Sequence, residues 1–106
     1  MASNYIQPGE VIDHTPTSAV ASGEAVVIGG RVGVALDDIA ANETGSVAMT
    51  GVFELPKKDA EAASKGVTVY WNGSALTTTA SGNTEAGYAF RAAAAEDTTC
   101  HVKLRG

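Results

Sequence analysis

Two glycine-containing dipeptides set the strongest limits on how this chain folds. Gly29-Gly30 and Asn72-Gly73 each lie between two short runs of residues that favour strands. Two-residue turns of this composition readily adopt the positive backbone angles that a tight β-hairpin requires. We therefore predict one hairpin over residues 25–36 and a second over residues 67–78.

A longer extended segment, residues 46–55, ends abruptly at a proline. Phe53 and Leu55 supply apolar bulk, and Gly51 permits a bulge or a bend in the strand. Pro56 has no N–H to donate to a neighbouring strand, so we expect pairing to stop there. The sequence thus predicts a long strand with a bend near Gly51.

Short strands separated by turns account for most of the remaining sequence. We expect further strands at residues 10–14, 86–92 and 99–104. Turns that recur at intervals of roughly 8 to 12 residues are typical of sandwiches and small barrels. Because the chain has only 106 residues, one domain is expected. We predict a single small all-β domain of about eight short strands, arranged as a sandwich or a partly closed barrel.

Two segments depart from this strand pattern. Residues 1–8 are mostly polar and lead into a Pro-Gly turn signal, so we predict an extended N-terminal arm ahead of a β domain over residues 9–106. Residues 58–65 have the composition of a helix and precede Gly66, which suits the left-handed cap that ends many helices. We predict one short surface helix over residues 58–65.

The charge and hydropathy of the chain argue against nucleic acid and membranes as partners. The chain has 12 acidic and 7 basic residues, a net charge of -5, and its basic residues form no cluster beyond Lys57 and Lys58. Binding of duplex nucleic acid draws its affinity from neutralised phosphates. No run approaches the roughly 20 apolar residues of a membrane span, and the N-terminus lacks the basic and apolar regions of a signal peptide. We expect a soluble, unexported protein that binds neither nucleic acid nor membrane.

Residue types that carry catalysis do not occur here in the required patterns. The segment from Gly29 to Gly33 lacks the Lys-Ser/Thr pair of a phosphate-binding loop. Cys100 precedes His101, and adjacent side chains of a strand point to opposite faces, so the two form neither a nucleophilic dyad nor a chelate. His14 lies on a different predicted strand, which leaves no zinc-ligand spacing. We therefore predict a non-enzymatic protein without metal or cofactor.

Tyr70 and Trp71 are neighbours in a predicted strand. Exposed rings of this kind stack on sugars or bases. In an alternating strand one ring points inward, and the other suits an interface, where tyrosine and tryptophan are favoured. We favour a core or interface role, and a small ligand- or carbohydrate-binding module that uses Tyr70 and Trp71 is the alternative.

Several short motifs follow one another in order along nearly the whole chain. They include Asn4-Tyr5-Ile6-Gln7-Pro8-Gly9, Gly33-Val34-Ala35, Gly51-Val52-Phe53-Glu54-Leu55-Pro56-Lys57, Val69-Tyr70-Trp71 and Gly87. In order and spacing, the series resembles the small capsid cement, or head decoration, proteins of tailed bacteriophages and prophages. That family is sometimes labelled as a phage recombinase of the RecA type. We reject the label here because the chain lacks both a phosphate-binding loop and a basic path for DNA.

The resemblance implies a structural protein of the virion that is assembled in the cytoplasm of the bacterial host. Such a protein binds the outer surface of the assembled capsid, with the major capsid protein as its partner, and reinforces the shell. It commonly does so as a homotrimer at local symmetry axes. The resemblance brings no catalytic residues with it.

Two sets of residues are candidates for the contacts that the resemblance implies. We expect the arm to order on the shell, at an entropic cost that makes binding sensitive to the mature lattice. The expected capsid contacts are Asn4, Tyr5, Ile6 and Gln7. Phe53, Leu55 and Trp71 are expected in the core or in contacts between subunits. An oligomer that engages several capsomers at once gains affinity through effective concentration.

Overall fold

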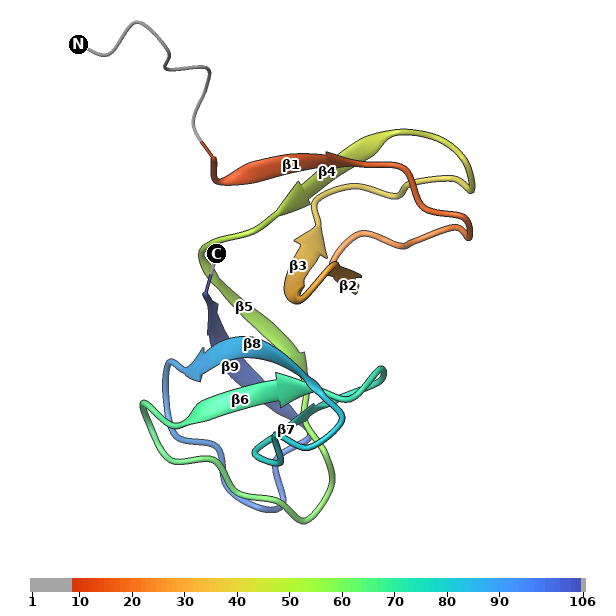
Figure 1. Cartoon of the computed structure of the whole chain (residues 1–106). Helices are drawn as coiled ribbons and strands as arrows, with labels where there is room; N and C mark the ends of the chain where they lie inside the picture. Colours follow the sequence, from red (N-terminus) through yellow and green to blue (C-terminus); the bar gives the residue numbers. More distant parts are fainter. Residues whose placement is uncertain (1–8, 106) are drawn as a thin grey trace, which may run out of the picture.

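The computed structural model describes residues 9–105, which form nine strands in two antiparallel sheets and contain no helix (Figure 1). The first sheet consists of β1 (Val11–His14), β2 (Ala25–Ile28), β3 (Arg31–Ala35) and β4 (Gly45–Ala48). The second consists of β5 (Val52–Pro56), β6 (Thr68–Trp71), β7 (Leu76–Thr77), β8 (Thr84–Ala89) and β9 (Thr99–Leu104). The all-β prediction is confirmed. The arm predicted for residues 1–8 lies outside the described residues.

Gly29-Gly30 joins β2 to β3 in the tight hairpin that the sequence predicts. Ile28 pairs with Arg31 across the turn, so the loop has two residues. Gly29 has a φ of 60°, the positive angle needed at the first turn position to match the twist of the strands. β4 pairs with β3 and carries β1 on its other side, which gives the order β1-β4-β3-β2.

Two loops cover one face of the first sheet and enclose a small core. Val20 and Ile39 lie on these loops and exchange two backbone hydrogen bonds, each 2.8 Å between N and O. The side chain of Ile39 packs directly over Gly45, where there is no room for a Cβ atom. The buried residues of this core are Val26, Ala35, Ile39, Val47 and Met49.

The second predicted hairpin joins β6 to β7 through four residues instead of two. Trp71 pairs with Leu76, which leaves a loop of four residues between them. The side-chain oxygen of Asn72 accepts hydrogen bonds from the backbone N–H groups of Ser74 and Ala75, both at 2.9 Å. Asparagine forms such turns in place of a backbone hydrogen bond. The hairpin is therefore present, but the predicted two-residue turn is wrong.

The second sheet has the order β5-β9-β8-β6-β7, and its two outer strands approach each other at one point. Lys57, directly after β5, forms a parallel bridge with Leu76 of β7, and the N–H of Lys58 donates to the carbonyl of Leu76 at 2.8 Å. A single bridge curls the sheet without closing it. The described chain thus holds two sheets and no closed barrel.

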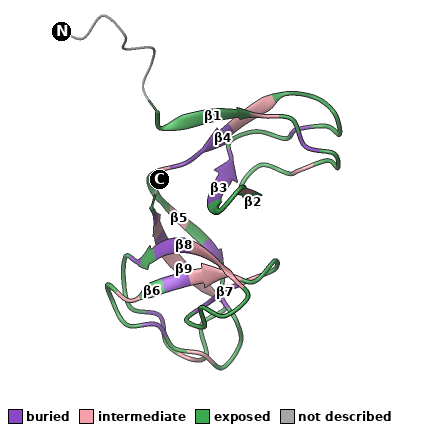
Figure 2. Cartoon of the chain, viewed as in Figure 1, coloured by how far each residue is buried: buried purple, intermediate pink, exposed green. Residues whose placement is uncertain are grey.

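The two sheets meet where β3 contacts β8, and Figure 2 shows buried positions on both strands. Side chains from both sheets contribute to the main core. Val32 and Val34 of β3 are buried in the core that the second sheet encloses. The largest core residues of the second sheet are Leu55, Val69, Leu76, Val102 and Leu104. Because one strand of the first sheet completes this core, the halves of the chain fold together.

The strand predicted over residues 46–55 is divided between the two sheets. β4 ends at Ala48 and β5 begins at Val52, and between them Gly51 has a φ of 107°. The bend expected near Gly51 is present. The segments on its two sides belong to different sheets, however, because the chain leaves the first sheet there and enters the second (Figure 1).

The helix predicted over residues 58–65 is wrong, because this segment forms an irregular loop. Ala60 has a φ of 59°, an angle that no right-handed helix contains. Ala63 and Ala93 exchange backbone hydrogen bonds of 2.9 and 2.8 Å, which tie the loop to a distant segment. Helix propensity is a weak preference, and here tertiary contacts override it.

Candidate interaction surface

One side of the second sheet points away from the core and exposes large apolar side chains. Val52 pairs with Lys103, and Lys103 with Tyr88, so these three residues form one row across β5, β9 and β8. Phe90 lies in the next row, beside His101 and Glu54, because its N–H donates to the carbonyl of His101 at 2.8 Å and His101 pairs with Glu54. The exposed fractions of Val52, Tyr88 and Phe90 are 42%, 41% and 47%.

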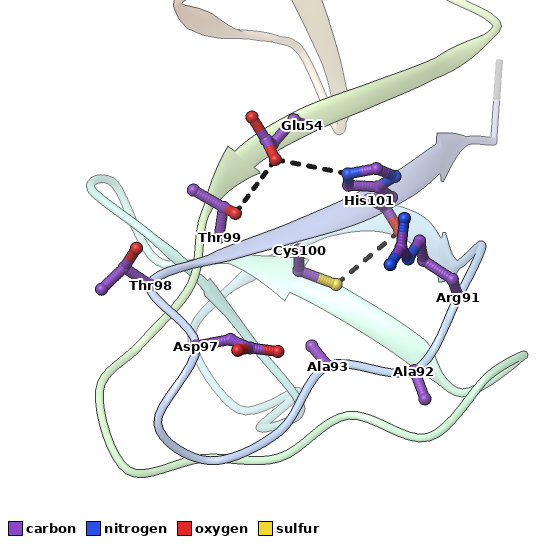
Figure 3. A pocket seen from close by; sticks show the side chains of 9 residues that line it. All are labelled: Glu54, Arg91, Ala92, Ala93, Asp97, Thr98, Thr99, Cys100 and His101. Carbon is purple, nitrogen blue, oxygen red and sulfur yellow. Dashed lines mark hydrogen bonds and ion pairs between the residues drawn. The ribbon is translucent and has the colours of Figure 1, made fainter.

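Charged groups alternate with these apolar side chains. The Nε2 atom of His101 lies 3.3 Å from a carboxylate oxygen of Glu54, and the hydroxyl of Thr99 donates to the same oxygen at 3.2 Å (Figure 3). The Nζ atom of Lys103 lies 6.0 Å from the centre of the Tyr88 ring, within the range of a cation–π contact. We define the outer face as Val52, Glu54, Tyr88, Phe90, His101 and Lys103.

A polar hollow of about 300 Å³ adjoins the outer face and is lined in part by Arg91, Asp97 and Thr98 (Figure 3). Cys100 lies at its base but is only 2% exposed, and its Sγ atom donates to the carbonyl of His101 at 3.7 Å. Burial raises the pKa of the Cys100 thiol, although the charge of Lys57 acts in the opposite direction. A protonated thiol is a poor nucleophile, so this hollow offers no activated cysteine.

Side chains suited to metal binding are dispersed among the described residues. Within residues 9–105, no three His, Cys, Asp or Glu side chains are close enough together to hold a metal ion. His14 ends β1 in the first sheet, whereas His101 belongs to β9 in the second. Across the same residues, no helix is long and apolar enough to cross a membrane.

Tyr70 and Trp71 are both half-buried, and they lie on opposite faces of β6. Trp71 packs against the main core on the same side as Val69, whereas alternation turns Tyr70 to the other side. Trp71 also lines a hollow of about 270 Å³ between the two sheets, together with Leu55 and Pro56. The two rings therefore do not form the single stacking platform that the carbohydrate-binding alternative requires.

Lys57 forms a polar site in the interior that the sequence pattern did not single out. The residue is only 6% exposed. Its Nζ atom donates to the backbone carbonyls of Lys58, Glu61 and Ala95, at 2.9, 2.5 and 3.3 Å. Period-two alternation from the buried Leu55 places Lys57 on the inner face, and this was the available signal. The amine holds together two loops that are distant in sequence.

The comparison with known families decides the identity of the chain. A family model described as phage cement protein matches residues 6–104. The chain belongs to the phage cement protein family. Neither curated proteins nor solved structures yield a match. The match spans all nine described strands, so the cement protein fold includes both sheets.

The predicted site residues of this cement protein fall into two groups. Leu55 is buried in the main core, and Phe53 and Trp71 are half-buried and pack against it. The predicted capsid contacts, Asn4, Tyr5, Ile6 and Gln7, lie outside the described residues. The outer face was not predicted, because it requires knowing which strands of the second sheet are neighbours.

Glu61 fixes the short edge strand of the cement protein to the neighbouring loop. Its carboxylate accepts hydrogen bonds from the backbone N–H of Thr78 and from the hydroxyls of Thr77 and Thr78, the latter two at 2.9 and 3.0 Å. The Thr78 N–H lowers the pKa of Glu61 below its usual value of 4.5, desolvation opposes this, and the two hydroxyls and the charge of Lys58 add to it. The ionised form is therefore favoured in the folded state.

We predict that Glu61 makes the stability of the cement protein depend on pH in the acidic range. Because its pKa is lowered by folding, the stabilisation is present above the usual value of 4.5 and is lost as pH falls through the folded value. Urea unfolding from pH 7 to pH 3 should show that Glu61→Gln loses less stability on acidification than the wild type, and is less stable at pH 7. Glu96→Gln, at an exposed loop position, should follow the wild-type profile; parallel profiles for wild type and Glu61→Gln would contradict the prediction.

Proposed function

We propose that this cement protein binds the outer surface of an assembled phage capsid and stabilises the shell. The major capsid protein is its partner, and its place is the exterior of the virion after assembly in the host cytoplasm. The observation that carries the proposal is the family match over residues 6–104. The role we propose is structural and non-enzymatic.

We propose further that the protein acts as a homotrimer at local symmetry axes of the shell. A small domain makes a small footprint, and a single footprint of that size binds weakly. Once one subunit of a trimer is bound to the shell, the other two bind intramolecularly, at a high effective concentration. Stabilisation of the shell follows, because one trimer then bridges several capsomers.

Binding to capsids tests this function directly. The full chain is mixed with expanded capsids that lack it and, as a control, with unexpanded shells, and the mixtures are sedimented. We expect saturable co-sedimentation with expanded capsids and a higher temperature of shell disruption. A chain that stays in the supernatant at every concentration, with no change in shell stability, is not a cement protein for that capsid.

The N-terminal arm carries part of the proposed contact through Asn4, Tyr5, Ile6 and Gln7. Deleting residues 1–8 should weaken binding to expanded capsids by about tenfold or more, since each chain of an oligomer loses one contact. A full-length variant with serine at positions 4–7 keeps the length of the arm but lacks these four side chains, and it should show a similar loss of binding. Full occupancy by the truncated chain at wild-type concentrations would remove the arm from the proposal.

A further inference from the structure

We propose that the outer face of β5, β9 and β8 is the surface through which copies of this chain contact one another. Three large apolar side chains, Val52, Tyr88 and Phe90, share this face, each more than two-fifths exposed. Exposed apolar side chains that gather on one face of a protein mark interaction surfaces. In Figure 2, exposed and half-buried positions occur along β5, β9 and β8 between the buried ones.

Exposed apolar residues of the first sheet are dispersed instead. Val11 and Ile12 are consecutive in the edge strand β1 and so point to opposite faces. Val27 lies in β2, on the opposite edge of that sheet, and Leu36 lies in the loop after β3. The outer face is thus where exposed apolar side chains gather on one side of one sheet.

The distribution of charge favours the second sheet over the first as the place where two copies of the chain meet. Residues 9–50 contain six acidic residues and one basic residue, a net charge of -5, whereas residues 51–105 contain six of each and are neutral. Contact through the first sheets would place two acidic bodies within the Debye length of about 8 Å at physiological salt. Contact through the second sheets keeps the acidic halves apart.

The outer face is also suited to contact with further copies of the chain. It carries the carboxylate of Glu54 together with His101 and the ammonium of Lys103, interspersed with the apolar side chains. A surface with both signs of charge offers complementary partners to another copy of itself, whereas a partner with one strong sign would meet repulsion. Its two aromatic side chains, Tyr88 and Phe90, are of the type that dominates interface energies.

In the second sheet, packing through the outer face is favoured over pairing through the sheet edges. The edge strand β5 ends at Pro56, and the next residue, Lys57, is already bridged to Leu76 of β7. β7, at the other edge, has only two residues. Proline and very short edge strands are features that prevent sheets from extending into one another.

Sedimentation of the full chain without capsids tests the inference, over concentrations from about 1 µM to about 1 mM. We expect reversible association of the wild type, and an increase of about tenfold or more in the dissociation constant for Phe90→Glu. Leu36→Glu is the matched control, because it adds the same charge at a position that is 42% exposed, against 47% for Phe90, but lies in the first half of the chain. The control should associate like the wild type.

Val52→Glu supplies a second test at the other end of the outer face and should also weaken association, with circular dichroism confirming that all variants fold. A wild type that is monomeric throughout, or equal losses for Phe90→Glu and Leu36→Glu, would overturn the inference. So would Phe90→Glu chains that associate normally but no longer bind capsids, since the face would then belong to the shell. The inference deepens the trimer part of the proposed function and rests on it. Because this assay contains no capsid, it tests self-association separately from capsid binding.

Discussion

Replacing Gly87 with alanine is expected to destabilise the cement protein by about 3 kcal/mol or more. A Cβ atom there would overlap the backbone carbonyl oxygen of Lys103 and lie 2.8 Å from the carbonyl carbon. Relief requires β8 to move away from β9. Gly87 pairs with Leu104 on one side and Val69 on the other, and both of these side chains are buried in the main core. Separating the strands therefore opens the core.

The same position lies beside a β-bulge. Val69 pairs with Gly87 and Tyr70 with Glu85, so Ala86 is an extra residue in β8. Bulges increase the local twist of a strand. Glycine in a strand is typical of bulges and of positions that another backbone approaches closely. Gly87 is also one of the motifs by which the sequence resembles the cement family, and the contact with Lys103 gives that motif a structural cause.

Urea unfolding of Gly87→Ala against the wild type measures this effect. Gly30→Ala is the control, because a Cβ atom at Gly30 meets nothing within 4 Å. Its stability should stay within about 1 kcal/mol of the wild type. A Gly87→Ala protein as stable as the control would contradict the prediction, because β8 and β9 would then separate without cost to the core.

Local rules predicted the strands well, because strand and turn signals act over a few neighbouring residues. The Gly29-Gly30 hairpin has the register that its two-residue turn requires, and β9 occupies the predicted residues 99–104. Asn72 predicted a hairpin correctly, yet its side chain bonded to two backbone N–H groups and widened the loop. The residue type signalled the turn but not its geometry.

Features that depend on distant residues were missed. Residues 58–65 have helix composition, but Glu61 is held by Thr77 and Thr78, and its carbonyl accepts from Lys57. The outer face likewise combines residues from three strands whose order, β5-β9-β8, no local pattern encodes. The family resemblance, in contrast, depends only on order and spacing along the chain, so it could be recognised before either feature was known.

Lys57→Met is expected to cost about 3 kcal/mol or more, the second large effect. Methionine approximates the length of the lysine stem but has no N–H groups to donate. The carbonyls of Lys58, Glu61 and Ala95 would each lose a hydrogen bond. An unsatisfied buried polar group costs about 1–3 kcal/mol of stability. Part of this cost is offset when the loops move and water solvates the freed carbonyls.

Lys58→Met is the matched control for this substitution, because Lys58 is the adjacent lysine and its side chain is exposed. We expect its unfolding free energy to stay within about 0.5 kcal/mol of the wild type. Equal stability of Lys57→Met and Lys58→Met in urea would show that the buried amine contributes nothing beyond its packing.

The reactivity of the Cys100 thiol gives an independent measure of how firmly Lys57 holds the two loops together. The thiol is 2% exposed and its pKa is raised by burial, so under native conditions a thiol reagent reaches it only when the structure opens. Loss of the three hydrogen bonds to carbonyls should release the loops around residues 58–61 and 95. Water then reaches the sulfur of Cys100, burial no longer raises the pKa of the thiol, and a larger fraction of it is ionised. Labelling of Lys57→Met should then be about tenfold faster or more than labelling of Lys58→Met. Both variants could instead react at the wild-type rate while Lys57→Met is destabilised in urea. That result would mean that the amine stabilises the fold as a whole and does not hold the two loops together locally.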